Sequence, residues 1–131
     1  MRYLLDTNAC IAILKGNDEI LRDRLDKLGP NNVVICSVVR GELLFGARKS
    51  AQVEKNLRRV NEFCKGLESL PYDDRATDFY GTNRAILERA GTRIGEADLM
   101  ISSIALAYDL PVITRNVKEF MRVPGLRVET W

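Results

Sequence analysis

The stretch Tyr3–Asn8, with the sequence YLLDTN, is a short apolar strand that ends in an acid, a hydroxyl and an amide. An apolar run that ends in polar side chains is typical of the carboxyl end of a buried parallel strand. Open α/β sheets bind their ligands at that end. Asp6 is therefore the first candidate for chemistry. Asp is also a preferred N-cap, and a helix is predicted to begin near Thr7, so the stretch alone leaves both roles open.

The rest of the chain alternates between helical and extended patterns. Apolar residues at a 3.6-residue period predict amphipathic helices, and short β-branched runs predict buried strands. The predicted helices are 7–15, 18–28, 38–48 with Ser37 as its N-cap, 51–66, 74–90, 97–108 and a short turn at 116–121. The further predicted strands are 33–35, 67–70, 112–113 and an edge strand at 126–129. This alternation predicts an α/β fold, a short parallel-stranded central sheet flanked by helices.

Composition narrows the class of protein. The chain has 131 residues, 46% of them hydrophobic, which suits a single domain over residues 1–131 that needs no metal or disulfide to fold. The net charge of +2 is small, so affinity for a polyanion would have to come from local clusters. Three cysteines without C-x-x-C spacing indicate a reducing cytoplasm. Neither a leader pattern nor a run of roughly 20 apolar residues is present, so we expect a soluble protein without membrane contact.

Three further polar residues interrupt the apolar pattern. Glu42 lies on helix 38–48, and none of its neighbours three or four residues away is polar, which is costly for a carboxylate without a partner. Asp98 also has mainly apolar helical neighbours, although an acid in a first turn interacts favourably with the helix dipole. Asn116 follows strand 112–113, and its spacing to Glu119 also fits a variant of the capping box.

Considered together, these residues favour a metal site. Asp6, Glu42, Asp98 and Asn116 each follow a strand or lie near the start of a helix, so a parallel sheet could bring them to one edge. Oxygen ligands of this kind suit Mg²⁺ or Mn²⁺. The sequence contains no histidine, which removes Ser-His-Asp triads and histidine metal sites. The remaining chemistry is a metal that activates water and neutralises charge on a phosphoryl group.

Four ordered motifs resemble those of the PIN domain, and specifically of the VapC toxins of bacterial and archaeal toxin–antitoxin pairs. They are YLLDTN, SVVRGELLFGA, GEADLMISSIALAYDLPVIT and TRNVKEFMRVPGLRVETW, and together they span the chain. The resemblance implies a Mg²⁺-dependent endoribonuclease that uses a metal-activated water and leaves a 3′-hydroxyl and a 5′-phosphate. It also implies that Asp6, Glu42, Asp98 and Asn116 form the metal site.

Two positions depart from the family pattern. Many relatives have an aromatic residue and often proline just before the third acid, where this chain has Glu96 and Ala97; the extra acid could add charge to the site or point to solvent. Asn116 supplies a neutral oxygen, so Glu119 could contribute the missing charge through water. The residues expected to orient ligands or water are Thr7, Asn8, Thr114 and Glu119.

The resemblance further implies partners. RNA is the expected substrate, and the basic residues that could hold its backbone are Arg40, Arg48, Lys49, Arg84 and Arg115. A homodimer is expected, together with a cognate VapB-type antitoxin whose C-terminal segment lies in a groove and can present an arginine to the acidic pocket. The RNA sequence that is cut is not encoded in any readable pattern.

Two alternatives differ in class. One is a phosphotransferase with Asp6 as nucleophile, although that fold normally has a second Asp two residues on, where this chain has Asn8. The other is a catalytically silent PIN-fold binding module. Acids at all three carboxylate positions argue against the silent module.

Overall fold

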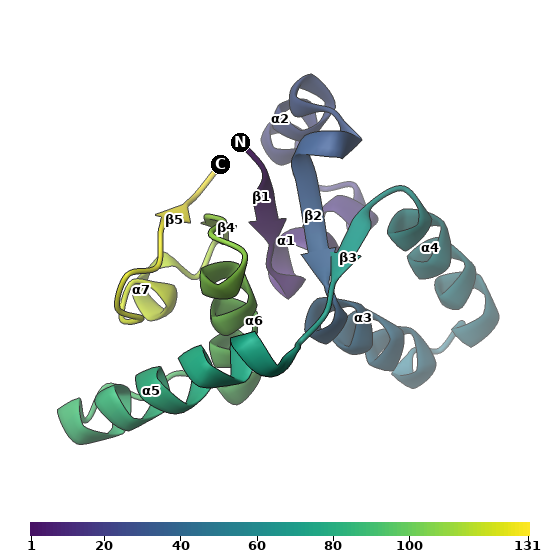
Figure 1. Cartoon of the computed structure of the whole chain (residues 1–131). Coiled ribbons are helices and arrows are strands. Elements are labelled where there is room, and N and C mark those ends of the chain that lie inside the picture. The colour runs from purple at the N-terminus through teal and green to yellow at the C-terminus, as the bar shows by residue number, and fades with distance from the viewer.

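The computed structural model describes residues 1–131 and contains one five-stranded sheet, in the spatial order β3-β2-β1-β4-β5. All four neighbouring pairs of strands are parallel, as the sequence predicted. The strands are β1 (Tyr3–Leu5), β2 (Val33–Cys36), β3 (Glu68–Leu70), β4 (Val112–Ile113) and β5 (Val128–Glu129). Figure 1 shows β1 and β2 in the middle of the molecule, with helices around the sheet.

Seven α-helices connect and flank these strands, and their bounds lie close to those predicted. They are α1 (Thr7–Lys15), α2 (Glu19–Leu28), α3 (Ser37–Lys49), α4 (Val53–Lys65), α5 (Asp74–Ala90), α6 (Glu96–Ala107) and α7 (Val117–Phe120). A short 3-10 turn, Pro30–Asn32, precedes β2. Gly16 ends α1 in the left-handed conformation, with a φ of 68°, which explains why a glycine stops this helix.

The core lies where the sheet meets its helices. β2 is buried along its whole length, and Leu4 and Leu5 of β1 are fully buried. Helix α6 is buried on most sides, and Ser102 and Ser103 donate their hydroxyls to carbonyls one turn back within it. The apolar pattern of this segment therefore reflects packing on more than one side, as predicted. All three cysteines are buried and free, and no helix has the length and apolar character of a membrane span.

The strand order fixes where a site can form. The chain adds β2 and β3 on one side of β1 and then places β4 and β5 on the other, so the order reverses between β1 and β4. Open parallel sheets bind ligands at such a switch point, beyond the carboxyl ends of the strands. Asp6 directly follows β1 and Thr114 directly follows β4, which puts both residues at this point.

The prediction that Ser37 caps α3 is wrong. Cys36 occupies the N-cap position without a side-chain cap hydrogen bond, and Ser37 is the first residue of the helix. The Ser37 hydroxyl instead accepts a hydrogen bond from the backbone N–H of Tyr72, 3.1 Å away. The Ser37 side chain therefore forms a tertiary contact with the segment after β3 instead of the helix cap that its residue type favours.

Candidate active site

Asp6 is the most deeply buried acid at the switch point, with 2% of its surface exposed. One carboxylate oxygen accepts the backbone N–H of Ala9 at 2.8 Å, so Asp6 does cap α1. The other accepts a hydrogen bond at 2.5 Å from the hydroxyl of Thr114, which follows the neighbouring strand β4. Burial raises the pKa of Asp6 although both hydrogen bonds lower it. Capping therefore accounts for only part of this carboxylate's environment.

Glu42 extends from α3 toward the start of α1. The Thr7 hydroxyl donates to its carboxylate at 2.5 Å, which joins two helices at the edge of the sheet. The negative charge of Glu42 contributes to the raised pKa of Asp6, so the two carboxylates lie within electrostatic range of each other. Thr7 and Thr114 thus each donate a hydrogen bond to one of these acids.

Asp98 lies in the first turn of α6 and completes the group that we call the acidic site: Asp6, Glu42 and Asp98. The pKa of Asp98 is raised to about 6, first by burial. The negative charges of Glu119, Asp6 and Glu42 raise it further, in that order. None of these carboxylates takes part in any ion pair of the molecule. The structure therefore gathers like charges without a lysine or arginine to neutralise them.

Asn116 and Glu119 lie beside this site and are joined by a hydrogen bond; we call these two residues the bracket. The Asn116 amide donates to Glu119 at 2.5 Å, and Glu119 accepts the backbone N–H of Gly95 at 2.7 Å. These two hydrogen bonds lower the pKa of Glu119. Gly95 precedes α6, so the bracket ties α7 to the helix that carries Asp98. The predicted capping box is wrong, because Asn116 makes no side-chain cap and Glu119 bonds to α6 instead.

A chain of contacts connects the bracket to Asp6. The Thr114 hydroxyl, which donates to Asp6, also accepts the backbone N–H of Asn116 at 2.9 Å. A side-chain carbon built on Gly95 would lie 3.7 Å from a Glu119 oxygen and 3.8 Å from an Asp98 oxygen, so both carboxylates approach the same point. Asn8, by contrast, is exposed and its side chain makes no hydrogen bond in the structure.

The donor set fits a hard divalent cation. Every candidate ligand offers oxygen, and no basic side chain competes for it. No three acids converge at metal-binding distance. Like charges repel one another, and the hydroxyls of Thr7 and Thr114 and the N–H of Ala9 bond to individual oxygens of Glu42 and Asp6. A cation would reverse that repulsion and favour closer approach.

Comparison with known proteins shows which family the chain belongs to. A family model of the PIN domain matches residues 3–126. The tRNA(fMet)-specific endonuclease VapC of Salmonella typhimurium is 41% identical over 131 residues, which cover 100% of this chain and 98% of that protein. The chain belongs to the PIN-domain family and, within it, to the VapC proteins.

Two solved structures of VapC complexes are similar to this PIN domain over their full length. DNA-bound VapBC from Salmonella typhimurium matches with a TM-score of 0.95 and 40% identity, covering 100% of this chain and 98% of that one. VapBC2 from Rickettsia felis, bound to a DNA fragment from its promoter, matches with a TM-score of 0.94 and 36% identity, covering 100% and 99%. The resemblance stated from the sequence is confirmed. The phosphotransferase alternative, which requires a different fold, is left without support.

The predicted RNA contacts of this PIN domain fall into two groups. Arg115 is already paired with Asp18 at the start of α2. Arg84 is paired with Glu88 at 2.8 Å and with Glu96 at 3.2 Å. The remaining candidates are exposed and form no ion pair; they are Arg40, Arg48 and Lys49. Arg84 and Arg115 are therefore held by the protein itself.

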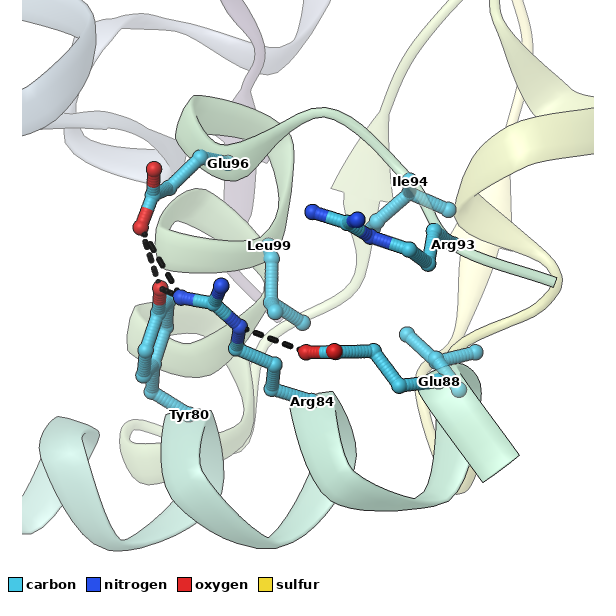
Figure 2. A pocket seen from close by; sticks show the side chains of 8 residues that line it. Tyr80, Arg84, Glu88, Arg93, Ile94, Glu96 and Leu99 are labelled. Carbon is cyan, nitrogen blue, oxygen red and sulfur yellow. Dashed lines mark hydrogen bonds and ion pairs between the residues drawn. The ribbon is translucent and has the colours of Figure 1, made fainter. Parts of the chain in front are cut away.

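A polar cluster on α5 and α6 accounts for the unusual Glu96. Figure 2 shows Tyr80 and Arg84 of α5 facing Glu96 at the start of α6, with Glu88 on the other side of Arg84. The Tyr80 hydroxyl donates to Glu96 at 2.5 Å and accepts from Arg84 at 2.8 Å. Glu96 therefore bonds to α5 rather than adding its carboxylate to the acidic site. Sequence reasoning missed Tyr80, whose 16-residue separation from Glu96 leaves no local pattern.

Proposed function

We propose that this chain is a metal-dependent endoribonuclease, the toxin of a toxin–antitoxin module, in which the whole of residues 1–131 acts as one PIN domain. The metal is Mg²⁺, with Mn²⁺ as a substitute, and its ligands are Asp6, Glu42, Asp98 and Asn116. One observation carries the proposal: Asp6, Glu42 and Asp98 lie within electrostatic range of one another without an ion pair to any cationic side chain, and burial together with the charges of Glu119, Asp6 and Glu42 raises the pKa of Asp98 to about 6. A bound divalent cation would remove that electrostatic cost.

The residues around the ion have distinct tasks in this proposal. A bound divalent cation supplies a polarised water and neutralises charge on the phosphodiester. Thr7 orients Glu42, and Thr114 orients Asp6 through the hydrogen bonds described above. Glu119 bonds to both Asn116 and Gly95 and so fixes the position of the start of α6, so that Asp98 faces the other acids. Because the chain has no histidine, its side chains offer no group with an unperturbed pKa near about 6.5 for proton transfer.

The substrate proposed first is transfer RNA. The Salmonella relative is named for action on tRNA(fMet), and it is similar over the whole chain. The experiment combines the purified chain with tRNA(fMet), with an elongator tRNA and with an unstructured RNA, in Mg²⁺ or in EDTA, and maps the RNA ends. We expect cleavage in Mg²⁺ alone, with 3′-hydroxyl and 5′-phosphate ends. A folded chain that binds an antitoxin but leaves every RNA intact in Mg²⁺ and Mn²⁺ would instead be the silent binding module.

A groove beside the acidic site suits the proposed antitoxin. It has a volume of about 420 Å³, lies between α1, α3 and α4, and reaches Glu42 at one end. Apolar side chains such as Ile11, Leu43 and Val60 line it. The C-terminal segment of a VapB-type antitoxin is proposed to lie here and to present an arginine toward Glu42. The crystallised relatives are VapBC complexes, which supports a partner of this kind, and a homodimer of this chain is proposed with it.

Two glycines offer a matched test of the groove. Gly46 of α3 lines it, whereas Gly81 lies on α5; both are exposed, and a side-chain carbon at either would meet nothing within 4 Å. Gly46→Leu should fill the groove and weaken antitoxin binding at least about tenfold in calorimetry, because one fully buried apolar side chain is worth roughly 1.5–3 kcal/mol. Gly81→Leu should leave the affinity unchanged. Equal affinities for both variants would place the antitoxin elsewhere.

A further inference from the structure

A basic hollow lies between α1, α2 and α4 and shares the last turn of α1 with the groove. Arg22 of α2 and Arg58 and Arg59 of α4 line it, and we use the name basic hollow for the space around these three arginines. Its volume is about 360 Å³, and Glu62 is the one acid among its lining residues. Charge of one sign therefore dominates this surface.

The arginines of the basic hollow are free of ion pairs. The ion pairs of the molecule engage other arginines: Arg2, Arg84, Arg115 and Arg127. Arg59 makes one hydrogen bond, from its guanidinium to the carbonyl of Leu14 in the last turn of α1. That bond holds one cation in place while leaving most of its donors available.

The basic hollow adjoins the groove that reaches the acidic site. Leu14 and Arg59 line both spaces, so they form a shared wall. Along α1, Thr7 contacts Glu42 at one end and Leu14 lies at the other. Seven residues at 1.5 Å per residue span roughly 10 Å. That distance is short enough for one RNA strand to reach both the acidic site and the basic hollow.

We propose that Arg22, Arg58 and Arg59 bind phosphate groups of the RNA strand a few nucleotides from the bond that is cut. The proposal rests on the ribonuclease function and adds a binding site outside the acidic site. Guanidinium groups bind phosphate through paired hydrogen bonds, and three unpaired guanidiniums with a single acid complement a polyanion. An acidic protein segment is the competing occupant, but the apolar groove next to the hollow offers a peptide more surface to bury.

The test removes two charges at the hollow and two elsewhere. The variant Arg22→Gln/Arg58→Gln loses two of the three arginines but keeps Arg59, whose contact with Leu14 could affect folding. The control variant Arg75→Gln/Arg89→Gln loses the same charge from α5, where both arginines are exposed and form no ion pair. Figure 1 shows α4 and α5 on opposite sides of the molecule.

Two measurements read the result. Fluorescence anisotropy in EDTA follows a labelled single-stranded RNA across a salt series, and steady-state cleavage in Mg²⁺ separates kcat from KM. We expect the hollow variant to bind RNA about tenfold more weakly, with the slope of log affinity against log salt reduced by about 1.4. Its KM should rise while kcat stays unchanged. The control variant should behave as the original chain does.

Three outcomes would overturn the site. Unchanged RNA affinity and KM in a hollow variant of a chain that does cleave RNA would remove the site and leave the proposed function intact. Unchanged RNA affinity with weaker antitoxin binding would identify the hollow as a protein-binding surface. An original chain that neither binds nor cleaves RNA would overturn the ribonuclease proposal, and this site with it.

Discussion

Two groups of charged side chains flank the start of α6, and they are built in opposite ways. In the polar cluster on α5 and α6, Arg84 lies between Glu88 and Glu96, so both acids have a cationic partner. In the acidic site, Asp98 faces further carboxylates and no cation. The same residue types thus stabilise one surface and strain the other.

The contrast teaches how to separate structural acids from functional ones in this molecule. Paired, exposed acids gain little from their partners, because water screens the interaction. Unpaired, partly buried acids cost free energy, and a fold retains them only if something else compensates. A bound cation is the compensation that we propose here.

The largest expected effect comes from breaking the acidic site. Asp6→Asn, Glu42→Gln and Asp98→Asn should each lower RNA cleavage at least about 100-fold, because each removes a charge from the proposed ion. The measurement is initial rate at fixed Mg²⁺, with folding checked by circular dichroism. Glu88→Gln and Glu96→Gln remove the same charge from the polar cluster and should keep at least about half the activity, since surface pairs contribute little. Comparable losses in both sets would erase the distinction between the two groups.

A smaller effect concerns the pH dependence of stability without metal. The pKa of Asp98 in the folded chain is raised from 3.8 to about 6. Between these values the folded chain binds more protons at Asp98 than the unfolded chain does. The free energy of unfolding should therefore fall through Asp98 as the pH rises across this window. The pKa of Asp6 is also raised and contributes with the same sign.

Urea unfolding in EDTA between about pH 4 and pH 7 measures this dependence. In the Asp98→Asn variant the free energy of unfolding should decline much less as the pH rises. This variant should be more stable than the original chain near neutral pH, because it lacks the buried charge. The Glu96→Gln variant, changed two residues away, should show the same pH dependence of the free energy of unfolding as the original chain. Parallel curves for the original chain and Asp98→Asn would show that Asp98 ionises without cost and that the acidic site is not strained.

The smallest effect is expected from the polar cluster itself. Arg84→Gln should change the urea midpoint and the cleavage rate by less than the usual error of either measurement, because its ion pairs are largely exposed. RNA affinity should also be unchanged, since Arg84 is already held by Glu88, Glu96 and Tyr80. A clear loss of RNA affinity would restore Arg84 as an RNA contact and weaken the contrast.

The errors of sequence reasoning share one cause. Ser37 and Asn116 have residue types that favour capping, and the capping motifs around them are local. In the structure Ser37 bonds to Tyr72 and Asn116 bonds to Glu119, which itself reaches Gly95. Arg84 and Arg115 likewise have acidic partners that the fold supplies, and their role in RNA binding stays a prediction. A local pattern states what a side chain can do but does not identify the contact that wins.

The sequence by itself determined the α/β class and the approximate bounds of the helices and strands, and it singled out Asp6, Glu42 and Asp98 as candidates. These properties depend on periodicity and residue type within short windows, which the chain displays directly. Only the tertiary structure decided which charges are neutralised and which are left unpaired. The contacts that decide it join residues far apart, such as Thr114 and Asp6 at a separation of 108 positions and Thr7 and Glu42 at 35. Such contacts depend on strand order and helix packing, so they have no signature in any short stretch of sequence.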